Sequence, residues 1–186
     1  DNYTPPVPTF TGTKVFENYD LAEIRQYIDW GPFFIAWEMK GKFPDILTDA
    51  HAGTEATKLY NDANAMLDKI IADKWLTAKG VVGFWHAHKI APDTIELKDD
   101  KGHELCFLES LRQQQKKAAG QPHFSLSDFI RPAEKGADYM GAFAVSIHGI
   151  EPHLKRFIDN HDDYNKIMLQ AMADRLAEAF AEVLHK

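Results

Sequence analysis

Acidic side chains near the end of the sequence have a spacing that could bind a cation. Asp174, Glu178 and Glu182 follow one another at intervals of four residues, which places all three on one face of a helix. Like charges at this spacing cost roughly a few tenths of a kcal/mol per pair. This pattern is typical of a solvated helix face, and it would also suit one wall of a site for a cationic ligand.

A second candidate is Asp29, which lies among apolar residues directly before a Gly-Pro pair. We expect its carboxylate to be partly desolvated there. A desolvated charge needs a cation or several hydrogen-bond donors, because burying it alone costs several kcal/mol. The partner would be an ammonium or sulfonium group of a ligand, or else Asp29 caps the turn or pairs with Arg25. The residues themselves leave these alternatives open.

His86 and His88 could ligate a metal ion, because residues two apart on a strand point to the same face. A third ligand would be needed, for which His103 or Glu104 is the candidate. With nine histidines in 186 residues such a pair is unsurprising. The pattern therefore favours two histidines on a half-exposed strand over a metal site.

The motifs of several common enzyme classes are absent. The sequence has no GxGxxG or GxxxxGK[ST] loop for nucleotide phosphates, no CxxC or HExxH zinc motif and no GxSxG motif. Its single cysteine, Cys106, alternates with apolar residues in a predicted strand, so we expect a small buried hydrophobe rather than a nucleophile. No catalytic residue and no metal ligand is predicted.

Composition excludes further classes. With 21 Lys and Arg against 28 Asp and Glu, the net charge of the 186 residues is −7. The longest basic run is Lys116-Lys117, so binding to nucleic acid is not expected. No apolar run approaches the ~20 residues of a membrane span, and one cysteine cannot form an internal disulfide. A cytoplasmic protein that binds neither nucleic acid nor membrane is predicted.

Hydrophobic periodicity and turn residues predict an α+β fold, in which helices from both ends of the sequence pack on an antiparallel sheet. Asp100-Lys101-Gly102 is the expected hairpin turn. The run over 138–149 is the expected strand buried on both faces. An extended N-terminal arm without packed structure is expected over 1–19. Helices are expected over 21–30, from the N-cap Thr54 to about 78, over 152–158 and over 163–184. Strands are expected over 80–90, 93–100, 103–110 and 138–149.

Taken together, several segments resemble a known family. The sequence over residues 20–186 resembles the C-terminal reactivation domain of cobalamin-dependent methionine synthase. The segments that carry the resemblance are, in order, YIDWGPFFIAWEMKGKFPDIL, KLYNDANAMLDKII, GVVGFWHA, LESLRQQ, LSDFIRP, ADYMGAFAVS and HDDYNKIMLQAMADRLAEAFAEVLHK.

The resemblance implies a fold and a function. The fold would be a twisted antiparallel sheet with flanking helices, helmet-like in shape. The parent enzyme moves a methyl group from methyltetrahydrofolate through cobalamin to homocysteine. When the cofactor is oxidised to cob(II)alamin, this domain presents S-adenosylmethionine while flavodoxin or a similar reductase supplies an electron. Cobalamin would be bound by another domain of the parent enzyme and contacted by this one, which is not catalytic by itself.

The resemblance also assigns ligand-binding residues. Asp29 matches the family aspartate of the Ile-Asp-Trp motif, which contacts S-adenosylmethionine. Glu178 matches a glutamate at the edge of the same site, and Asp174 matches an acid near the ligand and the surface that faces cobalamin. A carboxylate suits this ligand because S-adenosylmethionine carries an ammonium and a sulfonium group.

Two departures from the family pattern matter. The Arg-Pro-x-Pro-Gly-Tyr-Pro motif, whose arginine holds the ligand carboxylate, does not occur in the chain, so the domain is predicted to be C-terminally incomplete and to bind S-adenosylmethionine weakly or not at all. His86 and His88 stand where other residue types are expected. The alternatives are a stand-alone module that docks cobalamin or a reductase without S-adenosylmethionine, and an independent metal enzyme that uses the two histidines.

Overall fold

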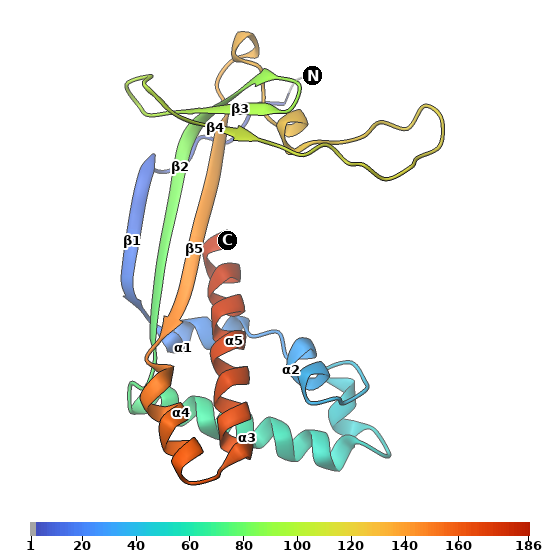
Figure 1. Cartoon of the computed structure of the whole chain (residues 1–186), viewed down its shortest axis with the longest axis vertical. Helices are drawn as coiled ribbons and strands as arrows, with labels where there is room; N and C mark the ends of the chain where they lie inside the picture. The colour runs from blue at the N-terminus through green and yellow to red at the C-terminus, as the bar shows by residue number, and fades with distance from the viewer. Residues whose placement is uncertain (1–2) are drawn as a thin grey trace. The chain divides into compact units, whose positions relative to one another are not determined.

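The computed structural model describes residues 3–186, and its contacts divide the chain into two compact units. Unit 1 contains the residues up to Lys14 together with Val82–Ala142, and unit 2 contains Val15–Val81 and Phe143–Lys186. Strands follow the order β1-β2-β3-β4, with β5 also paired to β2 (Figure 1). No helix within residues 3–186 has both the length and the apolar character needed to cross a bilayer.

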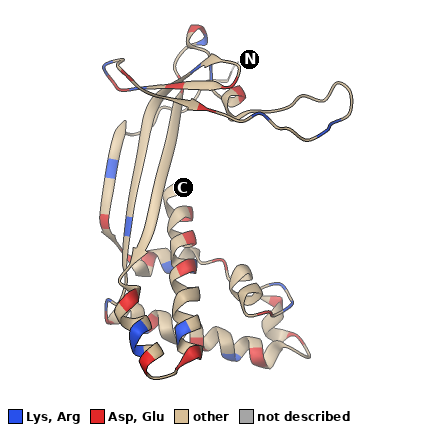
Figure 2. Cartoon of the chain, viewed as in Figure 1, with Lys and Arg blue, Asp and Glu red and all other residues tan. Residues whose placement is uncertain are grey.

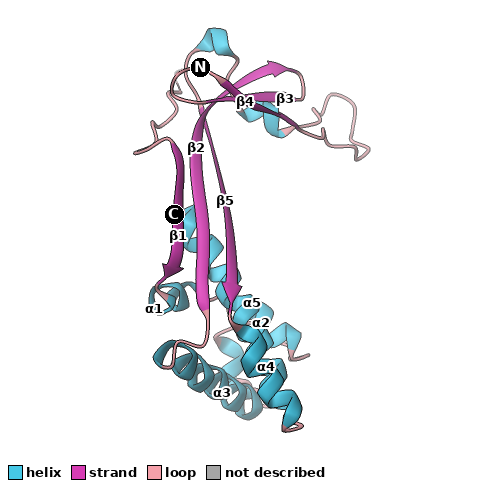
Figure 3. Cartoon of the chain, turned by 60° about the vertical axis from the view of Figure 1, so that its left-hand side comes forward, coloured by secondary structure: helices cyan, strands magenta, loops and turns pink. Residues whose placement is uncertain are grey.

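Unit 2 contains all the α-helices of the described chain (Figure 3). In Figure 3, α5 runs beside the strands β1, β2 and β5, the other helices gather at one end of these strands, and β1 and β5 run opposite to β2. The elements that lie in unit 2, of which β1, β2 and β5 continue into unit 1, are β1 (Gly12–Tyr19), α1 (Leu21–Ile24), the 3₁₀ helix η1 (Arg25–Tyr27), α2 (Gly31–Ala36), the 3₁₀ helix η2 (Asp45–Thr48), α3 (Gly53–Ala72), β2 (Thr77–Ala91), β5 (Tyr139–His148), α4 (Ile150–Asp159) and α5 (Asp163–His185).

The core of unit 2 is built around α5. Its apolar stripe at helical spacing is buried and packs against α1, α2 and α3. The helix also approaches β2 closely, because a Cβ placed on Gly80 would lie 2.7 Å from Phe180 Cζ. Tyr164 and Ile167, which precede this stripe at helical spacing, are 42% and 46% exposed. The buried members of the stripe are Met168, Met172, Leu176 and Phe180.

The starts of α5 and α3 differ in how the first backbone N–H groups are bonded. Asp162 caps α5 by accepting the backbone N–H of Asn165 at 3.1 Å. The prediction of Thr54 as the cap of α3 is wrong, since that helix already begins at Gly53. No side chain caps the start of α3, and Asp49 instead orders the preceding turn by accepting the N–H groups of His51 and Ala52 at 2.9 and 2.8 Å.

Unit 1 is a smaller sheet with long connections. The antiparallel pairs include His86 with Lys98 on β2 and β3, and Leu97 with Cys106 on β3 and β4. Its core is a separate cluster formed by Ala87, Ile95 and Leu97. Its further elements are β3 (Thr94–Lys98), β4 (Glu104–Glu109) and the 3₁₀ helices η3 (Leu126–Phe129) and η4 (Ala133–Lys135).

The hairpin between β3 and β4 turns where the sequence predicted it. The Asp99 carboxylate accepts the backbone N–H groups of Lys101 and His103, both at 2.8 Å. These bonds, with that from His103 the strongest, lower the pKa of Asp99. An aspartate that bonds the backbone two residues on is a frequent start of a tight turn.

The N-terminal arm differs from its prediction over residues 12–19, which form β1. Phe16 and Tyr19 pack against the core of unit 2 and hold this strand in place. The sequence here has no regular alternation, so the strand depends on contacts that are distant along the chain. Asp1 and Asn2 of the predicted arm lie outside the described residues.

Two burial predictions are wrong. Residues 141–144 of β5 are exposed, although this run was predicted to be buried on both faces. Cys106 is an exposed free thiol rather than a buried hydrophobe. The reason is its place on β4, which is the last strand in the order and is therefore an edge of the sheet.

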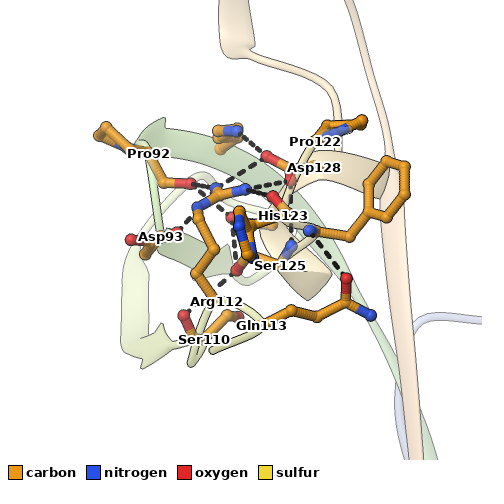
Figure 4. A network of polar contacts seen from close by, with 12 residues as sticks. Pro92, Asp93, Ser110, Arg112, Gln113, Pro122, His123, Ser125 and Asp128 are labelled. Carbon is orange, nitrogen blue, oxygen red and sulfur yellow. Dashed lines mark hydrogen bonds and ion pairs between the residues drawn. The ribbon is translucent and has the colours of Figure 1, made fainter. Parts of the chain in front are cut away.

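An ion-pair network holds the long connection after β4 in unit 1 (Figure 4). Arg112 donates to both carboxylate oxygens of Asp128, at 2.6 and 3.0 Å, and to the carbonyl of Pro92 at 2.8 Å. It also pairs with Asp93 at 2.7 Å, and Lys89 reaches Asp128 at 2.7 Å. Bonds from Arg112 and then Lys89 hold the pKa of Asp128 well below its usual range.

We expect Arg112→Ala to release this connection. Gln113 donates its N–H to the carbonyl of Phe124 at 2.9 Å across the loop, and its hydrogen exchange should become several-fold faster in the variant. Arg131→Ala is the control, because within residues 3–186 the Arg131 side chain donates only to the carbonyl of Lys135. A Gln113 amide that exchanges equally fast in Arg112→Ala and in the unsubstituted chain would contradict this role.

The same protection should not depend on pH between about 8 and 4. A carboxyl group whose pKa is lowered by folding stabilises the folded state above its unfolded pKa, near 3.9 for aspartate. That stabilisation is lost only as the pH falls through the lower, folded-state pKa of Asp128. Loss of Gln113 protection at pH 5 or 6 would show that another group controls the loop.

Candidate functional site

Asp29 lies in the turn that joins η1 to α2. Its neighbours Ile28 and Trp30 are buried, and their anchoring leaves Asp29 exposed between them. Its Oδ1 accepts the N–H of Gly31 at 2.8 Å, and Pro32 then occupies the first turn of α2. The expectation that Asp29 is partly desolvated is therefore wrong. Its Oδ2 has no hydrogen-bond partner within residues 3–186.

Arg25 does not pair with Asp29. Its guanidinium donates to Asp68 at 2.5 Å and to Asn64 at 2.8 Å, both on α3. Of the two intramolecular partners proposed for Asp29, the structure has the turn cap and lacks the arginine. One carboxylate oxygen therefore remains free to accept a bond from a ligand.

The opposing surface comes from the last turns of α5. Acidic residues, drawn in red, recur along this helix in Figure 2. Glu178 forms an ion pair with Arg175, and Glu182 lies 3.8 Å from the Lys186 ammonium. Asp174 pairs with Arg175 at 2.7 Å and is exposed.

These two surfaces line one cavity of about 570 Å³ within unit 2. Three carboxylates and two aromatic rings face it, and no arginine or lysine is among its lining residues. Carboxylates attract a cation by charge, and the faces of aromatic rings add a cation–π contribution of about 0.5–1 kcal/mol at exposed sites. The lining residues of this cavity, called here the acidic hollow, are Tyr27, Asp29, Phe143, Glu178, Ala181, Glu182 and His185.

One wall of the acidic hollow already faces a cation. The ammonium of Lys186 lies 4.4 Å from the centroid of the Tyr27 ring. The same ammonium lies 3.8 Å from Glu182. Tyr27 and Glu182 are thus placed to receive a positively charged group together.

The structure brings together two of the three predicted ligand-binding residues. Asp29 and Glu178, which are distant in sequence, both line the acidic hollow. Asp174 lies one turn before Glu178 and is not among the lining residues. Whether these side chains bind a ligand stays a prediction.

Glu182, the third lining carboxylate, belongs to the acidic series that the sequence indicated, although the resemblance assigned it no role. Other lining residues were not singled out by the sequence. Tyr27 lies two residues before Asp29, and only the fold shows that it faces the same side. Phe143 comes from β5, and nothing near it in the sequence indicates a site.

Within the described part of the chain, the structure places no third ligand beside the histidine pair. The His86 ring lies 5.0 Å from that of Tyr139, and its Nε2 is 3.5 Å from Asp100. His88 Nδ1 is buried without a hydrogen-bond partner. Over residues 3–186 no group of three His, Cys, Asp or Glu side chains is placed to hold a metal ion.

Comparison with known proteins identifies the family. Residues 20–186 match the family described as vitamin B12 dependent methionine synthase, activation domain. The chain also resembles a solved structure described as the MetH reactivation domain bound to AdoHcy, with 46% sequence identity and a TM-score of 0.91. The match covers 98% of this chain and 57% of that chain, so the chain spans little more than half of its relative. The predicted α+β fold, an antiparallel sheet with flanking helices, is confirmed, and the chain belongs to the activation-domain family of vitamin B12-dependent methionine synthase.

Proposed function

We propose that the acidic hollow binds the cationic part of S-adenosylmethionine. The observation that carries this proposal is that Asp29 and Glu178, which are distant in sequence, line one cavity with the Tyr27 and Phe143 rings. S-adenosylmethionine carries an ammonium and a sulfonium group, and both are attracted by carboxylates and ring faces. The relative described as bound to AdoHcy supports a ligand of this class.

The acidic hollow fits only part of that ligand. S-adenosylmethionine also has a carboxylate, and a bidentate arginine is the usual partner for such a group. No arginine lines the hollow. The resemblance gives that role to the Arg-Pro-x-Pro-Gly-Tyr-Pro motif, which this sequence lacks. The 186 residues should therefore bind S-adenosylmethionine weakly.

We further propose that the chain acts within methionine synthase, a methyltransferase, and is not catalytic by itself. Its task would be to present the methyl donor for reductive remethylation of cob(II)alamin. Cobalamin would be bound by another domain of the parent enzyme, which is one expected partner. The other is flavodoxin or a similar reductase, and the expected location is the cytoplasm. Support for these proposals comes from family membership.

The proposal is tested by titrating the ¹⁵N-labelled chain with S-adenosylmethionine and following backbone amides by NMR. Gly31, whose N–H bonds Asp29, and Ala181 on the opposite wall should shift together and saturate in the millimolar range or above. Micromolar affinity by calorimetry would contradict the stated need for the missing motif. Shifts at other residues without Gly31 and Ala181 would place the ligand outside the acidic hollow and contradict the proposal. No saturating shift at any concentration would favour the alternative, a docking module that does not use S-adenosylmethionine.

A further inference from the structure

A second cavity of unit 2 has the opposite charge character. It has a volume of about 490 Å³ and lies where α3, α4 and α5 meet. Two cations line it, against one carboxylate, in a chain whose net charge is −7. The lining residues of this cavity, called here the Arg156 cavity, are Asp62, Ala65, Met66, Lys69, Trp75, Arg156, Phe157, Tyr164 and Asn165.

Among the arginines of the described chain, Arg156 is the one whose guanidinium N–H groups have no acceptor. Arg25, Arg112 and Arg175 pair with carboxylates, and Arg131 donates to a carbonyl. The Arg156 guanidinium has no hydrogen bond and no ion pair within residues 3–186, and it contacts aromatic rings instead. Its N–H groups, which suit a carboxylate or phosphate in a bidentate arrangement, are therefore available.

Aromatic rings hold this guanidinium in position. It lies 5.1 Å from the ring centroid of Trp75 and 5.1 Å from that of Phe157. Trp75 is itself stacked on His153, with centroids 4.3 Å apart and an interplanar angle of 12°. Burial and then Arg156 lower the pKa of His153, so the histidine adds no charge at neutral pH. An arginine fixed in this way loses little freedom when it binds an anion.

The other lining residues do not neutralise the positive charge of the Arg156 cavity. The ammonium of Lys69, in the last turn of α3, has no ion-pair or hydrogen-bond partner among the described residues. Asp62, the one carboxylate, accepts the Tyr164 hydroxyl at 2.7 Å. That bond, after burial, raises the pKa of Tyr164 to about 12, so the phenol stays neutral and its O–H stays bonded to Asp62. The cavity thus presents two unpaired cations.

The volume and the apolar lining of the cavity indicate an organic anion rather than a bare ion. A volume of about 490 Å³ lies within the range of small-molecule sites. Met66 and Phe157 are buried and form apolar lining beside the two cations. We propose that the Arg156 cavity binds a small organic oxyanion, a carboxylate or a phosphate monoester, with Arg156 and Lys69 on the oxyanion and Met66 and Phe157 against its apolar part.

The proposal is tested by NMR titration of the 186-residue chain with phenyl phosphate and with phenylacetate, following the Trp75 indole N–H and the Arg156 Nε–H. At least one anion should produce saturating shifts with a Kd on the order of 1 mM or tighter. Whichever binds more tightly identifies the phosphate or carboxylate as the natural group. Inorganic phosphate should bind more weakly because it leaves the apolar lining uncovered, and neutral benzyl alcohol should not saturate the same signals.

Substitutions separate this site from general surface charge. Arg156→Gln should weaken binding by about tenfold, and Lys69→Ala by several-fold. Lys155→Gln is the matched control, since Lys155 is the neighbour on α4, pairs with Asp159 at 2.8 Å and does not line the cavity. Both cationic residues are exposed, so their variants should stay folded, which their spectra check directly. Non-saturating shifts, or equal affinity in Arg156→Gln and Lys155→Gln, would overturn the proposal.

This inference is independent of the S-adenosylmethionine proposal. The Arg156 cavity and the acidic hollow share no lining residue. Loss of anion binding in Arg156→Gln should leave the Gly31 and Ala181 shifts with S-adenosylmethionine unchanged. A negative binding result at one site therefore does not count against the proposal for the other site.

Discussion

Replacing Phe180 with alanine will lower the free energy of unfolding of unit 2 by about 3–5 kcal/mol. Phe180 is fully buried, lies 4.9 Å from the Tyr19 ring and faces Gly80 across the interface of α5 with β2. The alanine variant would leave a cavity at this contact, which the close-packed surroundings can fill only in part. Because total stabilities are commonly about 5–15 kcal/mol, such a loss is large.

Denaturant unfolding followed by the helical circular dichroism signal measures this effect, since the α-helices described here all belong to unit 2. Ile167→Ala on the same helix is the matched control. That side chain is 46% exposed, and we expect a cost below about 1 kcal/mol. Equal losses in the two variants would show that α5 is not anchored through Phe180.

The second large effect concerns charge in the acidic hollow. In a double variant, Asp29→Asn with Glu178→Gln, affinity for S-adenosylmethionine should fall by about tenfold. Both substitutions keep shape and remove charge, so the loss reports on the attraction of a cation. The expected loss is modest for two carboxylates because both are exposed, and solvent screens their charges.

NMR titration compares the double variant with Asp163→Asn, an exposed aspartate at the start of α5 that does not line the hollow. The control should bind like the unsubstituted chain. Glu178→Gln also removes a partner of Arg175, so each variant is first checked for native amide dispersion. Unchanged affinity in a folded double variant would mean that the hollow does not act through charge.

The elements that sequence predicted well are those with long, regular periodicity. The stripe from Met168 to Phe180 and the cap at Asp162 define α5 locally. β1 was not predicted, because its place depends on contacts of Phe16 and Tyr19 with a core that is distant in sequence. Local pattern does not report such contacts.

Exposure was harder to predict than secondary structure. Asp29 lies between two buried residues, yet it is exposed because neighbours in an extended turn point in different directions. Cys106 alternates with apolar residues, but β4 is an edge strand whose neighbours leave it exposed. In both cases the sequence indicated the element, and tertiary position decided the environment.

The candidate site likewise combines residues that the sequence indicated with residues that only the fold brings together. The resemblance assigned Asp29 and Glu178, and the fold places both on the acidic hollow. Asp174 shared that assignment but lies outside the lining residues and pairs with Arg175. Phe143 could not have been found from sequence, since only the pairing of β5 brings it beside α5.

The most direct test of the central claim is the transferred nuclear Overhauser effect between S-adenosylmethionine and the chain. If the acidic hollow receives the methyl donor's cationic end, protons near the sulfonium will show cross-peaks to the Tyr27 and Phe143 rings and to the Ala181 methyl group. Cross-peaks only to residues outside this set, with the three lining residues silent, would contradict the account.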